Sequence, residues 1–246
     1  MAPAPKDLIL RPGDFFRDLA SDPAAYRIPV LIVLIWGILT AVLTFLNISL
    51  VMGAFLQAAP HQQGMELMTG IFSVISVMGA VFSLPMAFVY WGVAAFGLYL
   101  VSSIFSRTGS ISHTATATAW GMIPLVICDA IRIPLFFLYR NAMAVTVSPG
   151  FFNLTMKGQA NGSVAYAPVS SAELAKYISF SHAFSEYSII SFMIFTLALL
   201  GCAWFWFHAL QHTRSLTPKQ AAITVLVPVV LFLGVMLASR IMSGWA

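Results

Sequence analysis

Charged residues are scarce in this sequence of 246 residues. It contains 12 Lys and Arg and 8 Asp and Glu, which make up 8% of the chain, whereas apolar residues make up 60%. Soluble domains carry roughly 25% charged and 45–50% apolar residues. So few charges cannot cover a water-facing surface, which excludes a cytosolic globular enzyme and a disordered tail. The net charge of +4 is too small and too scattered for a nucleic-acid partner.

Cysteine is also rare, whereas long uncharged runs are abundant. The two cysteines, Cys128 and Cys202, both lie in apolar stretches and form no disulfide framework. A helix needs about 20 mostly apolar residues to cross a bilayer, and its backbone groups must pair within their own segment there. Five runs without Lys, Arg, Asp or Glu meet that length: Arg27 to Glu66, Glu66 to Arg107, Arg107 to Asp129, Glu186 to Arg214, and Lys219 to Arg240. The sequence therefore predicts an all-α polytopic membrane protein, a bundle of five transmembrane helices.

The second apolar stretch is unusually long. We expect spans at about residues 28–56, 67–105, 114–138, 182–210 and 221–242, with a polar loop over residues 139–181. A helix over residues 67–105 would be about 58 Å long, nearly twice the bilayer core. Pro85 lies near its middle, so either one helix is kinked there or two shorter segments meet there. The positions of the glycosylation acceptors favour a single crossing, because two crossings would leave their loop in the cytoplasm.

Charge placement predicts the topology. Four basic residues precede or open the first span, and the positive-inside tendency then places the amino terminus in the cytoplasm: Lys6, Arg11, Arg17 and Arg27. Five crossings place the 139–181 loop and the carboxyl terminus outside. That loop contains two N-glycosylation acceptor motifs, at Asn153 and Asn161.

Residues 1–27 form a polar cap that contains a short amphipathic pattern. With Asp14 as the N-cap, Phe15, Phe16 and Leu19 share one face of a helix. Such a helix is expected to lie in the headgroup plane with its aromatic side chains at the acyl boundary. The alternative is a disordered tail in which the two phenylalanines are adjacent by chance.

Asp129 and Arg132 are the main candidates for an intramembrane polar site, with Glu186 as a third member. The first two lie three residues apart on one helix face in the third span, where a charge requires a partner or water. They could serve as a proton or ion relay or dock another membrane subunit, or they could form an internal pair that fixes helix packing. Glu186 is expected to complement the amino-terminal dipole of the fourth span, or to meet Arg132 or Arg140 from the third span.

His208 and His212 have the spacing that places two imidazoles on one helix face for metal binding. No third ligand stands at a recognisable spacing, so they are interpreted as residues of the membrane–water interface. Enzyme motifs for metalloproteases, serine hydrolases and nucleotide binding are absent from the sequence. We therefore expect no catalytic residue, no metal and no cofactor.

The order of the motifs resembles the prokaryotic branch of the Yip-domain family, named for Ypt/Rab-GTPase-interacting proteins. The resemblance covers nearly the whole chain and depends on four segments: Pro12-Gly-Asp-Phe-Phe16, Asp22-Pro-Ala-Ala-Tyr26, Ser106-Arg-Thr-Gly109-Ser110-Ile-Ser and Ala117-Thr-Ala-Trp120-Gly-Met-Ile-Pro124. It implies a cytoplasmic amino terminus, five membrane helices and a prokaryotic cell membrane. Eukaryotic members act in vesicle traffic and bind small GTPases, but their Asp-Leu-Tyr-Gly-Pro type signature is missing here, which puts GTPase binding in doubt. The resemblance contributes no site residues.

Together these features predict a non-catalytic membrane scaffold or accessory subunit that organises a protein assembly or the surrounding lipid. Its expected partners are membrane lipid and either another membrane protein or a second copy of the chain. The alternative is a small transporter or channel component that uses the Asp129 and Arg132 pair.

Overall fold

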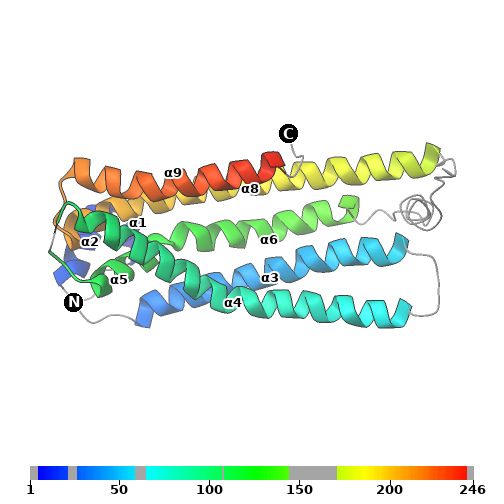
Figure 1. The fold of residues 1–246 in the computed structure, drawn as a ribbon, viewed down its shortest axis with the longest axis horizontal. Coiled ribbons are helices and arrows are strands. Elements are labelled where there is room, and N and C mark those ends of the chain that lie inside the picture. The colour runs from blue at the N-terminus through cyan, green and yellow to red at the C-terminus, as the bar shows by residue number, and fades with distance from the viewer. Residues whose placement is uncertain (1–4, 22–26, 59–64, 107, 144–170, 243–246) are drawn as a thin grey trace. The chain divides into compact units, whose positions relative to one another are not determined.

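The computed structural model describes residues 5–21, 27–58, 65–106, 108–143 and 171–242. Within these ranges the regular structure is entirely helical (Figure 1). The helices are α1 (Pro5–Leu10), α2 (Pro12–Ser21), α3 (Arg27–Ala58), α4 (Met65–Ser103), α5 (Ile111–Gly121), α6 (Ile123–Met143), α8 (Ser171–Thr213) and α9 (Pro218–Met242).

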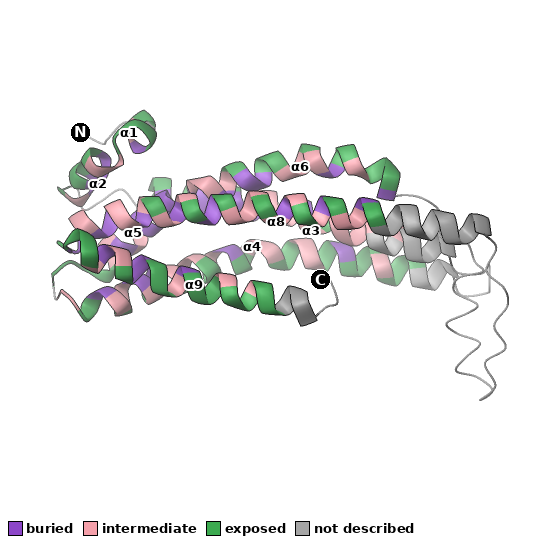
Figure 2. Ribbon diagram, turned by 90° about the horizontal axis from the view of Figure 1, so that it is seen from above, coloured by how far each residue is buried: buried purple, intermediate pink, exposed green. Residues whose placement is uncertain are grey.

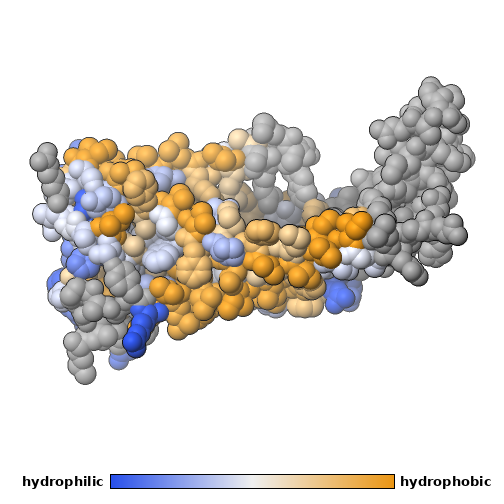
Figure 3. All heavy atoms as spheres, turned by 60° about the horizontal axis from the view of Figure 1, so that its bottom comes forward, coloured by the Kyte–Doolittle hydropathy of each residue, from blue (hydrophilic) through white to orange (hydrophobic). Residues whose placement is uncertain are grey.

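Five of these segments are long and apolar enough to cross a membrane. They are Arg27–Leu50, Thr69–Ser103, Ile111–Met143, His182–Thr213 and Pro218–Ala238. Many of their large apolar side chains point outward, such as Val81, Leu197 and Val235 at 64%, 67% and 69% exposure. Apolar side chains cover much of the face in Figure 3. The prediction of a polytopic all-α membrane protein is confirmed.

Contacts divide the chain into two compact units. Unit 1 contains Met1–Ile38, Leu84–Asp129 and Ile194–Ala246, and unit 2 contains Leu39–Ser83 and Ala130–Met193. Helices α3, α4, α6 and α8 contribute to both units, whereas α1, α2, α5 and α9 belong to unit 1. Each unit has a core of its own.

The second apolar stretch is one continuous helix. Helix α4 runs from Met65 to Ser103 with Pro85 inside it, and it provides a single candidate span. Proline has no N–H to donate, so the α-helical pattern loses one hydrogen bond at Pro85 without ending the helix. Of the two expectations, the structure therefore agrees with one helix through Pro85 and not with two segments that meet there.

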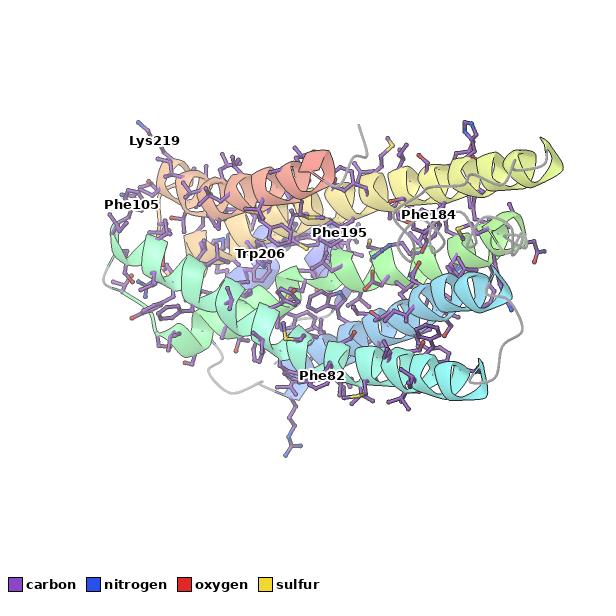
Figure 4. The ribbon with its side chains drawn as sticks, turned by 45° about the vertical axis from the view of Figure 1, so that its right-hand side comes forward. Phe82, Phe105, Phe184, Phe195, Trp206 and Lys219 are labelled. Atoms are coloured by element: carbon purple, nitrogen blue, oxygen red, sulfur yellow. The ribbon has the colours of Figure 1, made fainter. Side chains whose placement is uncertain are left out.

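The third span is broken, which the sequence analysis did not anticipate. Helix α5 ends at Gly121, and the Met122 N–H donates to the Ala119 carbonyl at 3.0 Å. The ring of Pro124 would clash with a carbonyl four residues earlier in an unbroken helix. The break leaves the Thr118 carbonyl free to accept from the Trp206 Nε1–H at 3.0 Å. Trp206 of α8 belongs to the hydrophobic core of unit 1 and is 7% exposed (Figure 4).

Gly121 is required where Trp206 crosses the break. A Cβ atom at this position would lie 2.3 Å from Cδ1 of the Trp206 ring. We predict that Gly121→Ala lowers the stability of the protein by about 1–3 kcal/mol, the usual cost of overpacking a core. The matched control is Gly92→Ala in α4, where a Cβ would meet nothing within 4 Å. Thermal melting of both variants in detergent checks this, and an equal melting temperature would contradict it.

Unit 2 packs mainly through aromatic and aliphatic side chains. Phe136 and Met143 of α6 form a cluster with Ala183 and Tyr187 of α8, and the Phe136 and Tyr187 ring centroids are 5.9 Å apart. Helices α3 and α4 approach closely in this unit, as the hydrogen bond from the Ser83 hydroxyl to Thr44 Oγ1 at 3.1 Å shows. The purple residues in Figure 2 show how small the buried share of each span is.

Candidate functional site at the α2 end of unit 1

Helix α2 packs on the protein rather than on lipid. The helix lies where the sequence predicted it, and Phe15, Phe16 and Leu19 share its inner face at 0%, 0% and 5% exposure. The Phe15 ring meets the Trp120 ring edge-on, with centroids 4.9 Å apart. These three side chains belong to a cluster with Leu8, Ile32, Ala117, Trp120 and Ala209.

These side chains were expected at the acyl boundary, and in the structure they are buried against other parts of the protein. The sequence periodicity identified the buried face correctly, but it carries no information on what covers that face. Here Trp120 and Ala117 of α5 and Ala209 of α8 belong to the cluster that buries it. The Nε1–H of Trp120 is buried there without a hydrogen-bond partner.

The outer face of α2 is polar. Asp14 and Arg17 form an exposed ion pair at 3.2 Å, one turn apart. Helix α2 begins at Pro12, so Asp14 lies in the first turn and not at the expected N-cap position. In that turn its carboxylate is favoured by the helix dipole. The exposed face of α2 thus presents charged side chains of both signs.

Arg214 fixes the connections at this end of unit 1. Its side chain is 1% exposed and follows the end of α8 directly. Nε donates to Ser102 Oγ at 3.1 Å, and Nη2 donates to Ser103 Oγ at 3.0 Å and to the Ser106 carbonyl at 2.9 Å. Nη1 donates to the Gly109 carbonyl, and the guanidinium lies over the Tyr99 ring at 4.6 Å from its centroid.

The hydrogen-bond acceptors around Arg214 in these contacts are neutral. The carbonyls of Ser106 and Gly109 follow the carboxyl end of α4, and the Arg214 carbonyl itself accepts from Thr108 Oγ1 at 3.0 Å. A cation is stabilised at helix carboxyl ends because the helix dipole is negative there. The arginine charge is thus engaged in holding backbone in place.

Gly109 permits this arrangement. Its φ of +77° lies in the left-handed region, and a Cβ would be 2.2 Å from the Thr213 carbonyl oxygen. Glycine is the residue that adopts this backbone without strain. In the sequence, Gly109 is part of a motif and Arg214 only ends an uncharged run. Neither the spacing between them nor the composition indicates their contact.

The side chains of His208 and His212 on α8 lie next to Gly13 of α2. A Cβ at Gly13 would be 3.8 Å from His212 Nε2 and 3.9 Å from His208 Nδ1, so the two helices approach closely here. His208 Nε2 is buried without a hydrogen-bond partner, and its ring packs edge-on against Trp204 at 4.6 Å. In the part of the chain that the structure describes, no group of three or more His, Cys, Asp or Glu side chains could hold a metal ion.

Asp129 and Arg132 lie three residues apart on helix α6, and Glu186 lies on α8. Asp129 is 4% exposed and is the last residue of its segment of unit 1, whereas Arg132 is half-buried and belongs to unit 2. Glu186 is exposed. It lies in the first two turns of the candidate span His182–Thr213, as expected, but α8 already begins at Ser171, so Glu186 is not at the amino-terminal end of the helix. Asn153 and Asn161 lie outside the described residues.

Two buried hydroxyl groups in unit 2 were missed by sequence reasoning. Tyr187 and Ser191 are 4% and 5% exposed, lie one turn apart on α8, and have hydroxyl groups without a hydrogen-bond partner. In the sequence they resemble ordinary residues of an apolar span. Only their burial distinguishes them.

Comparisons with known proteins agree with this architecture. The sequence model of the Yip1 domain matches residues 6–239, and the chain therefore belongs to the Yip1 domain family. It is also similar to an uncharacterized protein of Methanocaldococcus jannaschii, with 29% identity over 135 residues that cover 54% of this chain and 89% of the relative. No solved structure matches the chain.

Proposed function

We propose that this Yip1-family membrane protein is a non-catalytic scaffold or accessory subunit that organises a membrane-protein assembly or the lipid around it. The seating of α2 on Trp120 is the observation that carries the proposal. Phe15 and Phe16 are fully buried, so α2 is held as part of the folded protein. Its polar face, which includes the Asp14–Arg17 pair, is thereby presented at a fixed place.

The same proposal includes an orientation and a set of partners. We place the α2 end in the cytoplasm of a prokaryotic cell, with the carboxyl terminus outside, because Lys6, Arg11, Arg17 and Arg27 gather near the first span. The partners are membrane lipid and another membrane protein or a second copy of the chain. A surface with both signs of charge favours a partner with complementary charges at the membrane face.

Capture from native membranes tests the proposal. The tagged protein is extracted in mild detergent, and its mass and co-purifying proteins are compared with those of a charge-reversed variant, Arg17→Glu with Asp18→Lys. Both positions are exposed, so the fold should be kept. We expect a reproducible complex that the variant weakens. Recovery of the same solitary protein from both preparations would contradict the proposal.

A second candidate function is favoured by Asp129. A carboxylate that is 4% exposed inside an apolar span is costly, and such groups mark ion or proton pathways in many transporters. In that case Asp129 would carry the transported ion or proton, with Arg132 as its neighbour on the chain. Flux into sealed vesicles separates this candidate from the scaffold.

A further inference from the structure

Helix α1 has an apolar edge that the protein leaves uncovered. Ile9 and Leu10 are 68% and 74% exposed, although their neighbour Leu8 is 1% exposed. Leu8 belongs to the cluster of Phe15, Phe16 and Trp120, so α1 is fixed to unit 1 by one side chain while the next two point away. In Figure 2, α1 lies with α2 beside the α5 end of unit 1.

The neighbours of Leu8 indicate its depth along the membrane spans. Its cluster includes Ile32, Ala117 and Ala209. At 1.5 Å per residue, these lie about 8, 9 and 6 Å inside the ends of their spans at Arg27, Ile111 and Thr213. Interfacial helices bury their apolar side chains about 5–10 Å into the boundary between headgroups and acyl chains. Counted from the ends of the candidate spans, the cluster of Leu8 falls within that range, and Ile9 and Leu10 follow Leu8 directly.

The charged residues near Ile9 and Leu10 also fit a position at the membrane interface. Lys6 and Arg11 are exposed on either side of this segment, and Asp7, next to Lys6, is half-buried. Long basic side chains beside apolar ones commonly extend from the acyl boundary to the phosphate layer. Two large aliphatic side chains between two cations therefore complement a phospholipid interface.

We propose that Ile9 and Leu10 are the membrane-interface anchor of this protein, seated in phospholipid at the acyl boundary. Phe15 and Phe16, the residues expected from the sequence to do this, instead attach the anchor to the bundle through Trp120. The lipid contact thereby couples the interface to α5 and α8. This inference depends on the membrane location and is independent of the proposed scaffold role.

Site-specific fluorescence quenching tests the anchor. Ile9→Cys, Leu10→Cys and Arg17→Cys are each labelled with an environment-sensitive dye and placed in phosphatidylcholine and phosphatidylglycerol vesicles. The native Cys128 and Cys202 are 2% and 0% exposed, so they should not react. Arg17 lies at the same end of unit 1 on the polar face of α2, which makes it the matched control.

We expect nitroxide-bearing lipid to quench the dye at positions 9 and 10 several-fold more than at position 17. Aqueous iodide should show the reverse order. Equal access of iodide to all three positions would overturn the proposal. Protection of positions 9 and 10 from both quenchers would also overturn it, because protein would then cover the pair. Unchanged melting of each variant verifies that the exposed substitutions keep the fold.

Discussion

Replacing Arg214 with alanine should destabilise the protein more than any other single change at this end of unit 1. The substitution removes four hydrogen bonds that the guanidinium donates and leaves the carbonyls of Ser106 and Gly109 without their cation. Hydrogen bonds to charged groups contribute about 1.5–3 kcal/mol each, and an unpaired buried carbonyl costs about 1–3 kcal/mol. Because these effects are not additive, we expect a loss of about 3–5 kcal/mol.

Thermal melting in detergent, followed by tryptophan fluorescence, measures this loss. Arg214→Lys should recover only part of the stability, because an ammonium cannot reproduce the planar guanidinium that donates to Ser102, Ser106 and Gly109 at the same time. Lys219→Ala is the control, since Lys219 is exposed in the first turn of α9. If the Arg214→Ala and Lys219→Ala variants had the same melting temperature, the role assigned to the arginine would be wrong.

Replacing both Phe15 and Phe16 with alanine should release α2 from the bundle without unfolding the spans. Truncating a buried phenylalanine costs about 3–5 kcal/mol. Helix α2 is a peripheral element held mainly by Phe15, Phe16 and Leu19. The cost of truncating both phenylalanines should therefore exceed the free energy by which α2 is docked on the rest of unit 1.

The rate of labelling at Leu19→Cys reports the release. Leu19 is 5% exposed, so maleimide should modify this cysteine slowly in an otherwise native chain. Adding the two alanines should raise the rate by at least about tenfold, since each 1.4 kcal/mol changes an equilibrium tenfold. Adding Arg17→Ala instead should leave the rate unchanged. Fast labelling before the phenylalanines are removed would show that α2 does not dock.

Features encoded in local patterns were predictable from the sequence. The five spans follow from hydropathy and length, and the face formed by Phe15, Phe16 and Leu19 follows from helical periodicity. Pro85 could be located as a special position, but whether its helix continues depends on neighbouring packing. Proline inside a long membrane helix is tolerated when other groups satisfy the backbone.

Features that depend on distant contacts were not predictable. Arg214 and Gly109 are far apart in sequence, and a loop arginine shows no sign of burial before the fold is known. The same applies to Phe15, whose periodic face could be covered by lipid or by Trp120. The break at Met122 was missed because Pro124 also fits the first turn of a helix. The unexpected start of α8 at Ser171 then moved Glu186 away from the helix end.

Flux through sealed vesicles tests the central claim most directly. Purified protein is reconstituted in parallel with Asp129→Asn and with Glu186→Gln, whose carboxylate is exposed and serves as the control. The scaffold account predicts that all three preparations pass protons and small ions no faster than protein-free vesicles. A flux through the native protein and Glu186→Gln that Asp129→Asn abolishes would contradict it.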